Sequence, residues 1–195
     1  MPRREIRITG YGGQGVILSA HILGKAATLF DGLHATMTQS FGPEARGSAC
    51  SAQLVVSDEP IAYPYVKKTD YLIAMSQEGF DLHIGTLKDD GVLIYEEDLV
   101  KLGEHEGRPN SFGVPATRIA EGLGRRIVLN IAMLGFVATT ADLVTADSLR
   151  QAVAASVPDG TEELNLKAFE GGHGYHHDAE RSGDRGRNLG DPVGA

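Results

Sequence analysis

Short runs of β-branched and aromatic residues alternate along the chain with longer segments in which apolar residues recur at helical spacing. The strand-like runs cover residues 6–9, 35–38, 52–56, 71–75 and 92–95. The helix-like segments cover residues 16–29, 77–87, 127–141, 146–157 and 161–169. Parallel strands need crossover connections and helices supply them, so this alternation predicts an α/β fold with a mainly parallel, Rossmann-like sheet flanked by helices.

The pattern changes near residue 171. Residues 1–170 are enough for a single α/β domain whose core needs neither disulfides nor a metal. Residues 171–195 are rich in Gly, His, Asp and Arg and almost lack large apolar residues, so burial there does not offset the entropy of ordering. We therefore predict a flexible C-terminal tail, or a strap that lies on a partner.

Charge and composition exclude several classes of protein. The formal net charge is −8 and the 18 Lys and Arg residues are scattered, which excludes nucleic acid as a partner. No apolar run approaches the roughly 18 residues of a membrane span, and no signal-peptide core follows Met1, so we expect a cytoplasmic chain without a membrane. A single cysteine, Cys50, supplies neither an internal disulfide nor a four-thiolate cluster, so any iron–sulfur centre belongs to another chain.

A glycine-rich turn follows the first strand-like run and opens the first helix-like segment. Such a turn points backbone N–H groups outward at the positive end of a helix, where an anion can be held. The sequence thus predicts an anion-binding site made of Gly12, Gly13, Gln14, Gly15 and Val16. The same glycines are also compatible with a tight turn that only lets strand and helix pack closely.

A second candidate loop lies between the strand-like runs 35–38 and 52–56. It contains Glu44, Arg46 and Gly47, and the Arg46 guanidinium is a planar donor suited to carboxylate or phosphate. Loops at the carboxyl end of a strand are where open α/β sheets bind ligands. The alternative is that Glu44 and Arg46 are exposed turn residues, or pair only with each other.

Four sequence motifs occur in an order that resembles one protein family. The motifs are residues 10–16, 41–47, 70–75 and 130–135, followed by a closing helix that contains residues 165–169. Together they resemble the gamma subunit, or gamma domain, of the 2-oxoacid:ferredoxin oxidoreductases, whose members act on pyruvate, 2-oxoglutarate, ketoisovalerate, indolepyruvate or phenylglyoxylate. The similarity covers about residues 5–170 and leaves open which 2-oxoacid is used.

The resemblance implies a role within a larger assembly. In this family the complex oxidatively decarboxylates a 2-oxoacid on thiamine diphosphate and Mg, passes electrons through iron–sulfur clusters, and commonly transfers the acyl group to coenzyme A. Those cofactors belong to alpha, beta and delta parts, and ferredoxin or a flavoprotein or NAD-linked subunit accepts the electrons. The gamma part completes the active-site channel and helps to hold or admit coenzyme A. No catalytic residue and no metal site is therefore expected in this chain.

Two alternatives follow from the residues alone. The first is a separate Rossmann-type enzyme that binds NAD or a flavin at the glycine turn. A dinucleotide site also needs an acid about 20 residues on, and Asp31 has that spacing but lies in a sequence typical of a helix end. The second alternative is a scaffold subunit whose glycine turn holds no ligand.

Overall fold

A six-stranded sheet with the strand order β2-β3-β1-β4-β5-β6 forms the centre of the molecule. The structure is a computed structural model that describes residues 2–41 and 49–181, with side chains described for residues 2–40 and 49–175. The strands are β1 (Arg4–Tyr11), β2 (His34–Phe41), β3 (Ala49–Ser57), β4 (Thr69–Ala74), β5 (Leu87–Glu96) and β6 (Ser111–Val114). Every strand-like run of the sequence therefore coincides with a strand, except that the run 71–75 extends one residue beyond the end of β4.

The sheet is mostly parallel, as predicted, and β3 is the exception. β1, β4, β5 and β6 pair in parallel, whereas β3 runs antiparallel to both of its neighbours, β1 and β2. A parallel connection needs a crossover of about a dozen residues or more. Only residues 42–48 connect β2 to β3, so these two strands form a hairpin instead.

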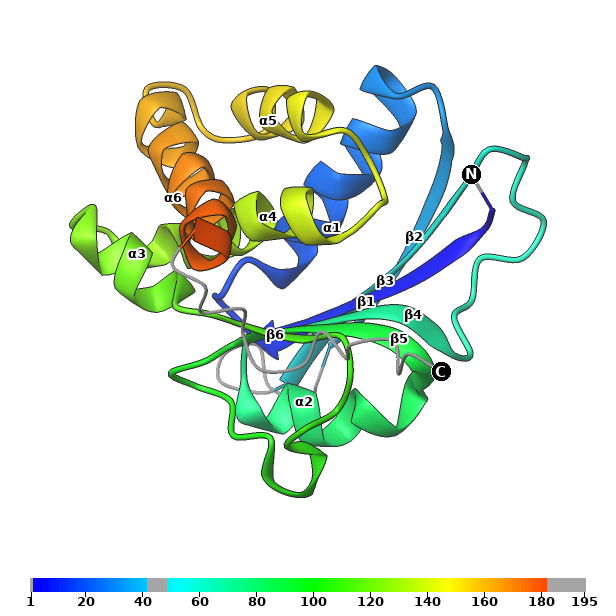
Figure 1. Cartoon of the computed structure of the whole chain (residues 1–195). Helices are drawn as coiled ribbons and strands as arrows, with labels where there is room; N and C mark the ends of the chain where they lie inside the picture. Colours follow the sequence, from blue (N-terminus) through cyan, green and yellow to red (C-terminus); the bar gives the residue numbers. More distant parts are fainter. Residues whose placement is uncertain (1, 42–48, 182–195) are drawn as a thin grey trace.

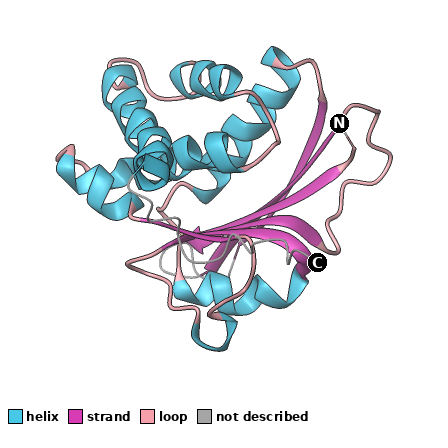
Figure 2. Cartoon of the chain, viewed as in Figure 1, coloured by secondary structure: helices cyan, strands magenta, loops and turns pink. Residues whose placement is uncertain are grey.

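Helices cover the two faces of the sheet unequally (Figures 1 and 2). Among the described α-helices, α2 lies on one face and the others lie on the opposite face. Their bounds are α1 (Val16–Lys25), α2 (Gln77–His83), α3 (Ala116–Gly122), α4 (Leu129–Thr140), α5 (Ala146–Ala154) and α6 (Glu162–Arg181). A π-helical turn, Ala26–Phe30, extends α1 to the length that the sequence predicted.

Strand alternation divides the buried apolar residues into two cores. Ile6 and Ile8 of β1 are fully buried in the larger core, together with residues of α1, α4, α5 and α6. Leu72 and Leu93, which point to the other face, form a smaller core with Phe80 of α2. Burying apolar area on both faces explains why these central strands are almost continuously apolar.

Helix α4 is the centre of the larger core, and α6 packs across it through two glycines. A Cβ atom at Gly135 of α4 would lie 2.0 Å from the Phe169 carbonyl oxygen, and one at Gly172 of α6 would lie 1.8 Å from that of Ala132. The ring of Tyr175 then packs 6.2 Å from the ring of Phe136. Backbones approach this closely only where side chains are absent.

Helix α6 is longer than the sequence predicted. We expected it to end near Phe169, but it continues to Arg181, because Gly172 is buried against α4 and the His173 ring stacks on Phe169. Tyr175, which belongs to the predicted tail, packs against the larger core of this chain. Residues 182–195 of the predicted tail lie outside the described residues.

Two short elements were not predicted, β6 and α3. β6 is only four residues long, and α3 ends at Gly122 after seven. Within the described part of the chain, no helix has both the length and the apolar composition needed to cross a bilayer.

Candidate functional site

The glycine-rich turn connects the carboxyl end of β1 to the start of α1, as the sequence predicted. Gly13 has a φ of 101° and Gly15 a φ of 75°, a backbone region that side chains rarely adopt. Gly15 is the N-cap residue of α1, and no side chain caps this helix. The glycines at these two positions therefore permit a turn that most other residues would strain.

Gln14 holds the turn together through both ends of its side-chain amide. Its Oε1 accepts a hydrogen bond from the Tyr11 amide at 2.6 Å, and its Nε2 donates to the Met75 carbonyl oxygen at 2.9 Å. The side chain thus ties the end of β1 to the end of β4. We infer that Gln14 positions the turn, which differs from the direct anion contact expected from the sequence.

Asn130, at the start of α4, supports the turn from the other side. Its Nδ2 lies 3.5 Å from the Gly15 carbonyl oxygen and 3.4 Å from Ser19 Oγ. A Cβ atom at Gly15 would come within 2.5 Å of that nitrogen. Sequence reasoning gave Asn130 no role, although a polar residue that opens an otherwise apolar helical run is a signal for one.

The amide groups at the turn are the donors that the site offers. Gln14 N–H donates to the Tyr11 carbonyl, and Ser19 N–H makes the first bond of α1. The amides of Gly13, Gly15 and Val16 make no such bond to any described residue, and no side chain caps them. Unpaired amides at a helix N-terminus favour an anion through both their N–H groups and the helix dipole.

The second candidate loop begins and ends beside this turn. Glu44, Arg46 and Gly47 lie outside the described residues, so their contacts are not assigned. The flanking residues are described: Ala49 pairs with Tyr11, and Phe41 pairs with Cys50, which also pairs with Gly10. Both candidate segments therefore start from the same edge of the sheet, where β1 and β2 end.

Comparison with known proteins decides the family. The sequence profile described as pyruvate ferredoxin/flavodoxin oxidoreductase matches residues 5–175. The chain belongs to this family. The resemblance that the four motifs indicated is thereby confirmed.

Three relatives illustrate the match. The 2-oxoglutarate synthase subunit KorC of Methanocaldococcus jannaschii is 46% identical over 173 residues, which cover 88% of this chain and 92% of the relative. The pyruvate synthase subunit PorC of Methanothermobacter thermautotrophicus is 38% identical over 170 residues, covering 84% and 91%. The gamma subunit of a keto/oxoacid ferredoxin oxidoreductase from Geobacter sulfurreducens has a TM-score of 0.77 at 34% identity, covering 90% and 99%. These relatives are oxidoreductase subunits of nearly the same length as this chain.

The structure disfavours a dinucleotide site at the glycine-rich turn. Both carboxylate oxygens of Asp31 are engaged at the start of α5, where they accept bonds from Thr145 N at 2.7 Å and from the hydroxyls of Thr145 and Ser148. Near the end of β1, the residues that pair with it on the two neighbouring strands are Ala49 of β3 and Ala74 of β4. No described acid is thus placed where a ribose diol would need one.

Two other ionisable groups at this end of the sheet, Cys50 and Glu96, are buried. Cys50 is buried in β3, and burial raises the pKa of its thiol, so the reactive thiolate is disfavoured. Glu96 is fully buried at the end of β5, where its carboxylate accepts bonds from Thr117 N at 3.1 Å and Leu99 N at 2.7 Å. Among the described residues, no group of three or more His, Cys, Asp or Glu is arranged to hold a metal ion.

Proposed function

We propose that this chain is the gamma subunit of a thiamine diphosphate-dependent, iron–sulfur 2-oxoacid:acceptor oxidoreductase, and that it helps to bind coenzyme A. The observation that carries the proposal is the uncapped start of α1, which lies at the same end of the sheet as the two strand ends that flank residues 42–48. Coenzyme A presents phosphate groups, which are the chemistry that such amides and an arginine recognise. Thiamine diphosphate with Mg and the clusters reside on alpha-, beta- and delta-type partners.

The role of this chain is binding and positioning. Gly12, Gly13, Gly15 and Val16 supply the turn and its amides, and Gln14 and Asn130 hold that turn in place. Arg46 supplies the side-chain cation. Thiamine diphosphate on the partner subunits supplies the decarboxylation chemistry, and ferredoxin or a flavoprotein or NAD-linked subunit receives the electrons.

We further propose that the substrate of the complex is 2-oxoglutarate. Three 2-oxoglutarate synthase subunits are 46%, 47% and 47% identical to this chain and a fourth is 34% identical, whereas two pyruvate synthase subunits are 36% and 38% identical. The isolated complex should therefore turn over 2-oxoglutarate with a higher kcat/KM than pyruvate or branched-chain 2-oxoacids. A clear preference for another 2-oxoacid would overturn this assignment and leave the coenzyme A site untouched.

The coenzyme A proposal is tested with Arg46→Ala and Arg46→Lys in the purified complex. We expect Arg46→Ala to raise the KM for coenzyme A about tenfold or more, with kcat and the KM for the 2-oxoacid close to wild type, because one charged contact is lost. Arg46→Lys should recover part of this effect. With pantetheine, which lacks the phosphates, wild type and Arg46→Ala should behave alike.

A matched control and three outcomes make the test decisive. Arg126→Ala removes an exposed arginine, with a side chain 61% accessible, whose closest acid is 4.0 Å away, and should change no kinetic constant. An intact complex with an unchanged KM for coenzyme A would reject the binding role. A complex that fails to assemble would favour the pure scaffold, and a single chain that binds NAD or flavin tightly would refute the subunit assignment.

A further inference from the structure

Two tyrosines stand exposed on the loop between β3 and β4. Tyr63 is 49% exposed and Tyr65 is 56% exposed, and their rings meet edge to face with centroids 5.5 Å apart. The ammonium of Lys67 lies 5.8 Å from the Tyr63 ring centroid. Single exposed aromatics are common on protein surfaces, but a packed pair that remains in solvent offers a ready-made apolar contact.

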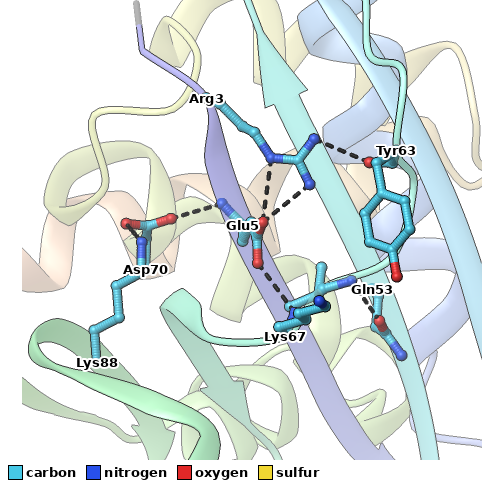
Figure 3. A network of polar contacts seen from close by, with 8 residues as sticks. Arg3, Glu5, Gln53, Tyr63, Lys67, Asp70 and Lys88 are labelled. Atoms are coloured by element: carbon cyan, nitrogen blue, oxygen red, sulfur yellow. Dashed lines mark hydrogen bonds and ion pairs between the residues drawn. The ribbon is translucent and has the colours of Figure 1, made fainter.

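The loop that carries the rings is fastened to the sheet, as Figure 3 shows. The Arg3 guanidinium donates to the Tyr63 carbonyl oxygen at 2.9 Å and twice to Glu5 Oε1, at 2.9 and 3.2 Å. Glu5 Oε2 in turn accepts a bond from Lys67 N at 3.2 Å. Arg3 and Glu5 thus bind the loop on both sides of the tyrosine pair.

A further contact on β3 completes the fastening. Gln53 Oε1 accepts a bond from Val66 N at 3.1 Å, and the Val66 side chain is 8% exposed. Pro60 and Pro64 remove two amide donors and fix two φ angles within the same loop. Binding therefore costs the two rings little conformational entropy, as expected for contact residues that are already ordered.

The surroundings of the rings are cationic, although the chain as a whole has a net charge of −8. Lys67 and Lys68 are exposed directly after the tyrosines in sequence, whereas the charges of Arg3 and Glu5 are paired with each other. The Asp70 carboxylate is likewise engaged, by Glu5 N and Lys88 Nζ, each at 2.8 Å. The exposed acids of the loop, Asp58 and Glu59, lie at its start, away from the tyrosines in sequence.

This surface and the glycine turn lie at opposite ends of β1 (Figure 1). The loop is held by Arg3, just before β1 begins at Arg4, whereas the turn follows the end of β1 at Tyr11. A protein docked on the loop would thus leave the amides of the turn accessible from the other edge.

We propose that the Tyr63–Tyr65 loop is a docking surface for another subunit of the complex, one with acidic side chains around an apolar pocket. The proposal rests on the chain acting as one subunit of a multi-subunit oxidoreductase. The tyrosine rings supply the apolar centre of the contact, and Lys67 and Lys68 pair with the acidic rim. Aromatic residues and arginine are the side chains most enriched at the centres of such interfaces.

The test uses the complex assembled from full-length subunits, with an affinity tag on this chain. We expect the double variant Tyr63→Ala/Tyr65→Ala to weaken retention of the partner about tenfold or more, as loss of central interface residues does. Lys67→Glu/Lys68→Glu should slow association and reverse its dependence on salt, because rim charges act mainly on the encounter. In the wild-type complex, amides of residues 62–68 should exchange hydrogen more slowly than in the isolated chain.

Matched controls carry exposed apolar side chains on other elements. Leu82→Ala on α2 and Ile127→Ala before α4 remove side chains of residues that are 59% and 73% exposed, and both should assemble like wild type. Circular dichroism melting of each variant separates lost binding from lost folding. The proposal is overturned when a folded double-tyrosine variant assembles normally and residues 62–68 gain no protection, even though the complex forms. It is also overturned when the variant loses only self-association of this chain.

Discussion

Gly172 on α6 lies so close to Ala132 on α4 that a Cβ atom at Gly172 would stand 1.8 Å from the Ala132 carbonyl oxygen. Because the obstructing atom is backbone, one helix must move as a whole to admit a side chain. We expect Gly172→Ala to lower the free energy of unfolding by about 2–3 kcal/mol, measured by urea denaturation. Gly174→Ala, two residues on and with no atom within 4 Å, should raise it by about 0.5–1 kcal/mol, since alanine favours a helix.

The pair formed by Gly15 and Asn130 predicts a coupling between the turn and α4. Gly15→Ala places a side chain at a φ of 75° and 2.5 Å from Asn130 Nδ2, whereas Gly32→Ala meets a φ of 67° with open space. We expect Gly32→Ala to cost about 1 kcal/mol from backbone strain alone, and Gly15→Ala to cost more. Adding Asn130→Ala to Gly15→Ala should recover the difference in a double-mutant cycle. Independent, additive effects would contradict the contact.

We predict that replacing Gln14 loosens the end of β1. Gln14→Leu removes the bonds to Tyr11 N–H and to the Met75 carbonyl oxygen, so we expect the free energy of unfolding to fall by about 1–3 kcal/mol. Hydrogen exchange at the Tyr11 amide should quicken at the same time. Gln151→Leu, at an exposed position of α5, is the matched control and should stay within about 0.5 kcal/mol of wild type.

We predict that the free energy of unfolding depends on pH through His83. Burial, together with the charge of Arg7, lowers the pKa of His83 to about 4 from 6.5. The unfolded chain therefore binds the proton first as the pH falls, so stability should drop between about pH 6.5 and pH 4, and His83 should contribute no slope above pH 6.5. The loss should be on the order of 1 kcal/mol, because His83 is only partly buried and solvent screens its charge.

The matched variant for this prediction is His83→Gln, compared with wild type by denaturation at a series of pH values. Its stability should change less than that of wild type across the same interval. Parallel curves for the two proteins would show that His83 does not titrate as described.

The sequence was most informative where one local rule decided the outcome. Thr145 caps α5 through a bond from Ser148 N, as its position before an amphipathic run predicted. The β1–α1 turn was predicted because clustered glycines between a strand and a helix have few other uses. The strands of the central sheet were found because β-branched residues concentrate in short apolar runs.

The errors arose where contacts distant in sequence decided the structure. Gly171 and Gly172 were taken as the start of a tail from composition alone, whereas the close packing of α6 on α4 requires Gly172. The antiparallel course of β3 was not predicted, although a seven-residue connection from Phe41 to Ala49 was too short for a crossover. The support that Asn130 gives to Gly15 spans 115 positions and has no local signal except the asparagine itself.

The β2–β3 hairpin has a consequence for how this protein can diversify. Its two strands pair in continuous register from His34 opposite Ser57 to Phe41 opposite Cys50. Lengthening a connection that is clamped at both ends costs little free energy, since closure entropy grows only with the logarithm of length. Insertions or exchanges within residues 42–48 can therefore accumulate without disturbing the register of the two strands that flank them.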